Sequence, residues 1–179
     1  FSGMVVAQAS GLDVFGAIAR WTADAFSFGD VSTLAASDIE EQLFYTEPDK
    51  TVPEEYKELQ TELKHRGSPL YFPEIPEGFE LVDNFLYVSE QDGGLNYSNC
   101  YLRESDMIGL AVNQNIETPE KIYEKDDSPV EEYLYNGVMH YLFTNLDNQV
   151  AVWIAGDLEY SISTTLSKDE LKELVQSVY

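Results

Sequence analysis

The chain has 179 residues, of which 44% are hydrophobic and 13% aromatic, and this composition excludes wholesale disorder. Ten Lys and Arg residues against 33 Asp and Glu residues give a formal net charge of −23. Such a charge would repel the phosphates of DNA, RNA and anionic membrane surfaces, so we expect no nucleic-acid partner. A chain of this length can bury a core large enough to fold without a metal or a disulfide.

The first nine residues are apolar or small and end in Ala7-Gln8-Ala9. They resemble either the end of a membrane span or the tail of a signal peptide. No stretch of the chain reaches the roughly 20 apolar residues that a spanning helix needs. We therefore expect a soluble chain that meets the membrane only through a removed N-terminal span.

An amphipathic helix is predicted next, within a juxtamembrane segment that covers residues 1–36. After a capping-box-like start at Ser10, apolar residues recur every three positions, at Leu12, Phe15, Ile18 and Trp21. The run from Phe26 to Asp30 is expected to end this helix. Its apolar stripe should pack on the main body, because exposed aromatic stripes are unfavourable in water.

Residues 37–69 are predicted to be a helical region. A start at Ser37 is stopped before Pro48. The better-marked helix begins at Thr51, which forms a predicted capping box with Glu54, and it closes at Gly67. Its narrow apolar stripe predicts a helix on the surface of the body.

From residue 70 the apolar pattern changes to the alternation that is typical of strands. Strands are predicted over residues 79–89, with a break at Asp83-Asn84, and over 95–102 and 107–112. A polar loop is predicted over 117–129. The stretch 117–132 holds seven acids and two lysines, and it is interpreted either as a solvated acidic coat or as a loose calcium site.

The last fifty residues predict a four-strand meander followed by a helix. Asn136-Gly137 is the strongest short-range signal for a two-residue hairpin turn. The strand 149–155 is apolar on both faces, so we expect it to be central and covered on each side. A capping box at Ser167 and Glu170 begins the closing helix. Its predicted buried stripe consists of Leu171, Leu174, Val175 and Val178.

These elements predict an α+β fold with an antiparallel sheet of about six or seven strands. The C-terminal helix should cover one face of the meander, with the N-terminal helices alongside. The sheet domain spans residues 70–179, and the whole chain is expected to form one compact unit.

The motifs that carry common chemistries are absent from the sequence. It holds no glycine-rich phosphate loop, no metalloprotease motif and no nucleophile elbow. Its one cysteine, Cys100, lies in alternating residues that indicate a buried strand position. The two histidines, His65 and His140, have no sequence-adjacent nucleophile, so both are interpreted as structural. We predict no catalytic, cofactor-binding or metal-binding residue, and therefore no enzyme and no cofactor.

The aromatic residues are the notable excess, with 12 Tyr, 9 Phe and 2 Trp. Those in the meander are interpreted mainly as cross-strand packing under the helix. A tyrosine-lined surface for a peptide, glycan or lipid is the functional alternative. Tyr133 and Tyr135 share one face of the first meander strand, and they are the predicted exposed part of such a surface.

The run Ile75-Pro76-Glu77-Gly78-Phe79-Glu80-Leu81 resembles the entry of a domain-of-unknown-function family, number 4367. The ending of the chain resembles that family more closely, and Asn136-Gly137 fits its central hairpin. The resemblance covers about residues 75–179 together with the piece from Gly11 to Phe28. The residues of the ending that carry it are Trp153, Gly156, Tyr160, Ile162, Leu166, Ser167, Glu170, Leu171, Ser177, Val178 and Tyr179.

This family forms the extracytoplasmic C-terminal part of single-pass membrane proteins in Gram-positive bacteria, some beside anti-sigma-factor-like or signalling modules. No catalytic residue is established for it, so the resemblance carries none over to this chain. It implies an extracytoplasmic, membrane-anchored protein, with Phe1 to Ala9 as the remainder of a span.

The prediction for function is therefore a non-catalytic extracytoplasmic binding or sensing domain of a membrane-anchored bacterial protein, in a signalling role such as an anti-sigma factor. Its partner would be a peptide, glycan, lipid or protein. Two alternatives stay open at this point. One is a carboxylate-based hydrolase, which would need two converging acids and a raised pKa on one of them. The other is a structural component of the cell envelope.

Overall fold

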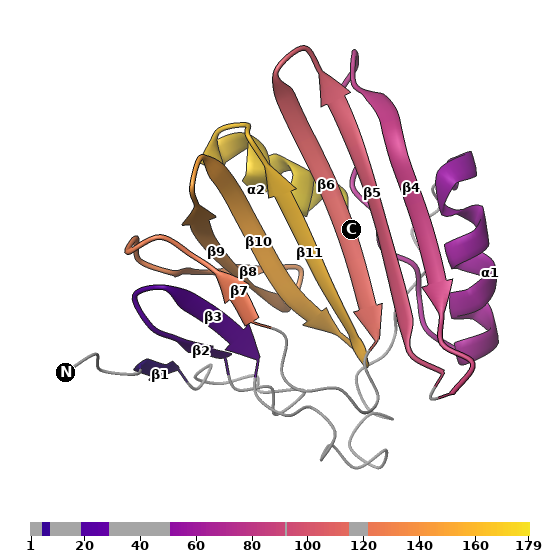
Figure 1. Cartoon of the computed structure of the whole chain (residues 1–179), viewed down its shortest axis with the longest axis horizontal. Coiled ribbons are helices and arrows are strands. Elements are labelled where there is room, and N and C mark those ends of the chain that lie inside the picture. The colour runs from indigo at the N-terminus through magenta and orange to yellow at the C-terminus, as the bar shows by residue number, and fades with distance from the viewer. Residues whose placement is uncertain (1–4, 8–18, 29–50, 92, 115–121) are drawn as a thin grey trace.

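The structure, a computed structural model, describes residues 5–7, 19–28, 51–91, 93–114 and 122–179. Two antiparallel sheets and two α-helices make up these residues, which confirms the predicted α+β class (Figure 1). The larger sheet has seven strands in the order β4-β5-β6-β11-β10-β9-β8, and the smaller has four in the order β1-β2-β3-β7.

The seven strands come from the part of the chain that was predicted to form the sheet. Their bounds are β4 Glu80–Val88, β5 Leu95–Arg103, β6 Asp106–Gln114, β8 Glu131–Tyr135, β9 Val138–Asn145, β10 Asn148–Ala155 and β11 Leu158–Thr164. The meander β8 to β11 is confirmed, and β6 pairs with β11 to join it to the hairpins β4-β5-β6. The predicted break at Asp83-Asn84 is wrong: β4 continues through these two residues with regular pairing, and its register shift lies before them, between Leu81 and Asp83.

The turns follow the chemistry of their residues. Asn136 and Gly137 have φ angles of 48° and 78°, which is the pair of positive values that a type I′ turn requires and confirms the predicted hairpin. The closing helix α2, Lys168–Ser177, begins at the predicted capping box. Ser167 accepts from the backbone N–H of Glu170, and the Glu170 carboxylate accepts from the backbone N–H of Ser167.

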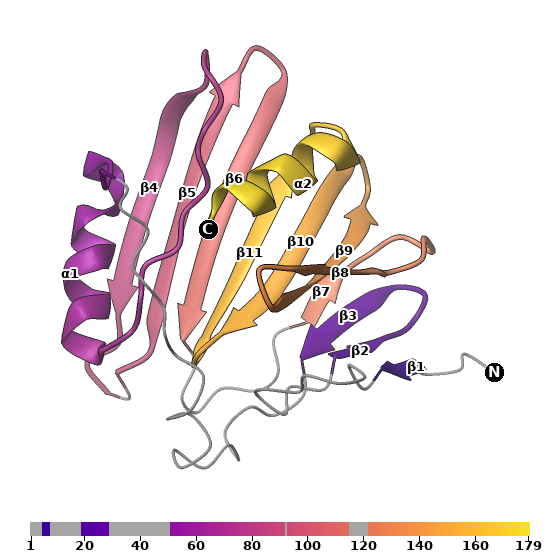
Figure 2. The same ribbon diagram turned by 180° about the vertical axis from the view of Figure 1, so that it is seen from behind.

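Helix α1, Lys57–Arg66, lies beside β4 and ends at Gly67, whose φ of 72° gives the expected left-handed cap (Figures 1 and 2). The predicted capping box at Thr51 and Glu54 is wrong. A short 3₁₀ turn, η2 Glu54–Tyr56, precedes α1 instead, and no side chain caps either element. The buried Tyr56 holds this turn on the sheet.

The predicted amphipathic helix is wrong over the residues that can be compared. Two strands, β2 Ala19–Trp21 and β3 Ala25–Phe28, form a hairpin in its place, and β1 Val5–Ala7 pairs with β2. The physical reason is the period-two alternation of Phe26 and Phe28, which lie buried on one face while Ser27 points away. The start of that helix at Ser10 and the predicted helix from Ser37 lie outside the described residues.

The smaller sheet includes a strand from the segment 117–129, which was predicted to be a loop. Strand β7, Ile122–Glu124, pairs with β3. The buried Lys125 ammonium then donates to the backbone carbonyl of Ala23, at 2.8 Å, in the turn between β2 and β3. A buried cation needs such acceptors, so Lys125 fixes β7 against this hairpin.

Each face of the larger sheet carries its own apolar core. The first core lies under α2, and Trp153 and Tyr160 stack there with ring centroids 5.4 Å apart. The second lies under the smaller sheet, where Phe26 packs on Phe143 at 5.2 Å. Strand β10 contributes to both cores, which confirms the prediction that it is central and covered on each side.

Candidate functional site

The seven-stranded sheet has one face covered by helices over most of its strands and one that is covered over fewer of them. Helices α1 and α2 pack on the first, which we call the covered face. On the other side, the smaller sheet packs against β9 and β10. Over β4, β5 and β6 no described element lies on that side (Figure 1), whereas at β11 the Tyr123 side chain of β7 reaches across and donates to Glu159 at 2.6 Å. We call this region the open face.

Strand register gives the membership of the open face, because directly paired residues point to the same side of a sheet. One cross-strand row runs through Phe85, Ser98, Ala111 and Ser161. The rows on either side of it begin at Asp83 and at Tyr87. The remaining members are Glu80, Asn96, Cys100, Leu102, Met107, Gly109, Asn113, Glu159 and Ser163.

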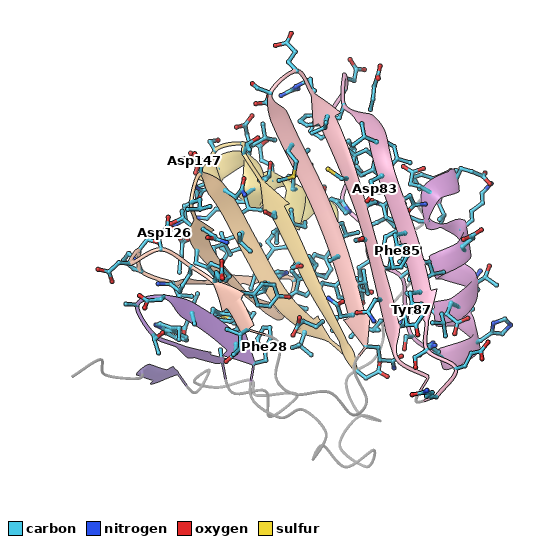
Figure 3. The ribbon with its side chains drawn as sticks, in the orientation of Figure 1. Phe28, Asp83, Phe85, Tyr87, Asp126 and Asp147 are labelled. Atoms are coloured by element: carbon cyan, nitrogen blue, oxygen red, sulfur yellow. The ribbon has the colours of Figure 1, made fainter. Side chains whose placement is uncertain are left out.

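The open face has aromatic side chains at one border and a floor of short ones. Phe85 and Tyr87, on the edge strand β4, are 54% and 52% exposed (Figure 3). The middle of the floor over β5, β6 and β11 has short side chains at Ser98, Gly109, Ala111, Ser161 and Ser163, which keep it low there. A partner that approached this face would meet two large anchors beside a flat surface.

The outer edge of β4 has no strand partner among the described residues, and α1 lies alongside it (Figures 1 and 2). Strand β4 is the terminal strand of its sheet, nine residues long, and most of its residues are exposed. Among the described residues, no backbone hydrogen bond joins this edge to α1 or η2, and the side-chain amide of Asn84 donates to the carbonyl of Glu55 in η2 at 3.2 Å. Long edge strands expose unpaired N–H and C=O groups that can accept another strand.

The charge around this edge is net negative: η2 and α1 beside it carry Lys57, Lys64 and Arg66 against four glutamates, and β4 itself adds only acids. Residues 70–91 contain five acids and no Lys or Arg, and Asp83 lies on the open face itself. The nearby Arg103 is already engaged, since it pairs with Asp106 at 3.0 Å and stacks over the Phe79 ring at 4.4 Å. The field at β4 is therefore negative and attracts cations.

The predicted surface residues Tyr133 and Tyr135 do not lie on the open face. They are on β8, on the same side as α2, and their rings stack 6.2 Å apart as the shared face predicts. Both are half-buried: Gln176 of α2 donates to the Tyr133 hydroxyl at 2.7 Å, and the Tyr135 ring lies 6.0 Å from that of Tyr179. Ligand contact at these two residues stays a prediction.

The two histidines lie far apart in the fold. His65 is exposed near the end of α1, whereas His140 is fully buried on β9, on the side opposite to Met139, Tyr141 and Phe143. The His140 ring lies 5.1 Å from that of Trp153. Burial lowers the pKa of His140 from 6.5 to about 4, so its imidazole is neutral in the folded protein.

Cys100 has the strand position that was predicted, but it is half-buried and not buried, because it belongs to the open face. Partial burial raises the pKa of its thiol, and the neighbouring Asp83 carboxylate raises it further. A raised thiol pKa lowers the fraction of nucleophilic thiolate.

A buried cluster of phenols joins η2 to β5, and it was not anticipated from the sequence. The Tyr101 hydroxyl lies 3.1 Å from that of Tyr56 and donates to Glu55 Oε1 at 2.8 Å. Asn99 Nδ2 donates to the Tyr97 and Tyr101 hydroxyls at 3.1 and 3.2 Å. Burial raises the pKa of all three tyrosines, so the phenols stay protonated and serve as donors. The period-two spacing of Tyr97, Asn99 and Tyr101 was the available signal for a shared face.

The described acids form no metal site, and the one acid held between two lysines is Glu131. Within the described ranges, no three His, Cys, Asp or Glu residues gather as metal ligands. The Glu131 carboxylate lies between Lys168 and Lys172, at 2.5 and 2.6 Å, and these ammonium groups lower its pKa. This is the opposite direction from the raised pKa that a general acid needs.

The fold and the open face define a two-sheet α+β domain that presents one partly uncovered β-surface. A family model described as "Domain of unknown function (DUF4367)" matches residues 69–178, and the chain belongs to this family. No curated protein matches the chain. No helix in the described part of the chain has both the length and the apolar character needed to cross a bilayer.

Proposed function

We propose that this protein is a non-catalytic binding or sensing domain, held outside the cytoplasm by a membrane anchor, and that the open face is its binding surface. The observation that carries the proposal is this face: it leaves the rings of Phe85 and Tyr87 in water beside short side chains. Exposed aromatic side chains that border a flat surface are typical of interaction sites. The resemblance to extracytoplasmic domains supports the anchored location and a signalling role of the anti-sigma-factor type.

A photo-crosslinking experiment tests the binding surface. The full-length protein in its host cells would carry p-benzoylphenylalanine at Phe85, or at Leu134 as the control. Leu134 is 56% exposed, a match for Phe85, but lies on the opposite edge strand β8. We expect a discrete covalent adduct from position 85 only, weakened by the neighbouring substitution Tyr87→Ser. Equal adducts at both positions, or none at position 85, would contradict the proposed surface.

Protease treatment of intact cells tests the location. An extracytoplasmic, anchored domain should be cleaved by external protease while a cytoplasmic marker protein stays intact. Recovery of the full-length protein in the cytosolic fraction, protected until the cells are lysed, would refute the location.

A further inference from the structure

The edge of β4 offers more than an apolar surface, because it can extend the seven-stranded sheet by one strand. We propose that β4 binds an extended, cationic segment of a partner protein, which adds to the sheet as an eighth strand. This inference rests on the proposed function and names the partner's chemistry and its place of contact.

Backbone geometry supports strand addition at β4. After the register shift between Leu81 and Asp83, the pairing of β4 with β5 is regular from Asp83 to Val88. The shift disturbs the edge only at its beginning, so six residues form a straight template. Peptides that add to an exposed edge obtain affinity from main-chain hydrogen bonds and specificity from alternate side chains.

The side chains on β4 specify what the alternate residues of such a segment would meet. On the open face, every second residue of an added strand would lie beside the row Asp83, Phe85 and Tyr87. Two of these contacts are aromatic and one is a carboxylate, so apolar residues flanked by Lys or Arg fit this row. The intervening residues of the added strand would point to the covered face, near η2 and α1.

Electrostatics favour a cationic partner over a second copy of this chain. The segment 70–91 has no positive charge to offset its five acids. Pairing β4 with β4 of another molecule would bring two such segments together, and like charges that face each other are destabilising. A lysine-rich strand would meet the opposite sign along the same edge.

The opposite edge of the sheet is a weaker template. Strand β8 has five residues against the nine of β4. Its Glu131 is already bound by two lysines of α2, and its two tyrosines pack toward α2. The β8 edge therefore supplies the controls: Leu134 and Glu132 are exposed there as Phe85 and Asp83 are on β4.

The test uses a defined seven-residue probe, acetyl-Lys-Thr-Val-Thr-Val-Thr-Lys-amide, which places two valines flanked by lysines on one face of a strand, with the full chain in titration calorimetry. We expect micromolar binding by the probe and at least tenfold weaker binding by a glutamate-for-lysine version and by a scrambled peptide of the same composition. Asp83→Lys and Phe85→Ser should each weaken binding about tenfold or more. The controls Glu132→Lys and Leu134→Ser should change it less than twofold.

Two readouts distinguish strand addition from simple charge attraction. Two versions of the probe would carry N-methyl groups on alternate backbone nitrogens, one on the odd positions and one on the even positions. One version should lose binding and the other keep it, because only one of these two sets of N–H groups faces β4. Amide hydrogen exchange should slow within residues 83–88 when the probe is bound.

Absence of binding, equal binding of the scrambled peptide, equal sensitivity to the β8 variants, or dimerisation through β4 would each overturn the inference. Failure here with a persistent crosslink at position 85 would leave the binding surface in place and remove only strand addition. Loss of both would remove the proposed function as well.

Discussion

Acidification should destabilise this protein through one buried imidazole. His140 Nδ1 lies 3.2 Å from the carbonyl oxygen of Tyr133, which can only accept, so the neutral ring donates from Nδ1. The other nitrogen, Nε2, then accepts from the Tyr179 hydroxyl at 2.9 Å. A second proton would fall on Nε2, oppose that hydrogen bond and place a charge in the core.

The pKa values of His140 in the unfolded and folded chain determine the sign and size of the change in the free energy of unfolding. In the unfolded chain the imidazole takes up a proton near pH 6.5, whereas the folded chain resists protonation until about pH 4. Unfolding therefore binds a proton in this window, and the free energy of unfolding falls as the pH falls. The loss from His140 is about 2 kcal/mol at pH 5 and about 3 kcal/mol at pH 4, and it levels off at lower pH.

Urea unfolding of the wild type and of His140→Gln at pH 7, 6, 5 and 4 measures this contribution apart from that of the acids. The variant should be the less stable protein at pH 7, and the difference between the two should shrink by about 3 kcal/mol by pH 4. Thr164→Val, also buried but without a titrating group, is the control and should show a difference that does not vary with pH. Parallel curves for wild type and His140→Gln would refute the assignment.

Three further predictions concern stability, each measured by urea unfolding at pH 7. Ser167→Ala should cost about 1 kcal/mol by removing the cap of α2, and Ser167→Asp should restore most of it. Leu174→Ala should cost about 2–5 kcal/mol by opening a cavity under α2, whereas Leu146→Ala, at a position 81% exposed, should change stability by less than about 0.5 kcal/mol. Phe26→Ala should cost about 3–5 kcal/mol, because the ring is buried in the second core, and an unchanged stability would show that β2 and β3 do not pack on the body.

Local signals were sufficient wherever the relevant contacts are close in sequence. The Asn136-Gly137 turn, the Ser167 capping box and the Gly67 helix end depend on residues within a few positions, and all three were predicted. The two-sided apolar pattern of β10 predicted correctly that both of its faces are covered. It did not predict what covers the second one.

The smaller sheet was missed because its pairing is non-local. Ser27 pairs with Ile122, about a hundred positions away, and a three-residue strand such as β7 leaves little periodicity to detect. The spacing of Trp21 to the preceding apolar residues suggested a helix. The alternation that indicates a strand instead rests on only two buried residues, Phe26 and Phe28. Tertiary packing on Phe143 selects the strand.

The residues of the candidate site were the hardest feature of this protein to predict from the sequence. Tyr133 and Tyr135 were selected for sharing a strand face, which is correct, but α2 packs on that same face and leaves them half-buried. Phe85 and Tyr87 have the same two-residue spacing. Their exposure follows from β4 being an edge strand and from the smaller sheet reaching no further than β11, and neither fact is encoded locally.

The second core changes what counts as the folding unit of this protein. The family match begins at residue 69, so it omits β1, β2, β3, η2 and α1. A fragment cut to those boundaries would leave Phe143 and Val152 without Phe26, and Tyr97 without Tyr56. Expression of residues 69–178 alone should therefore give an aggregation-prone product, and the boundaries for recombinant work should extend upstream to include the hairpin at Ala19.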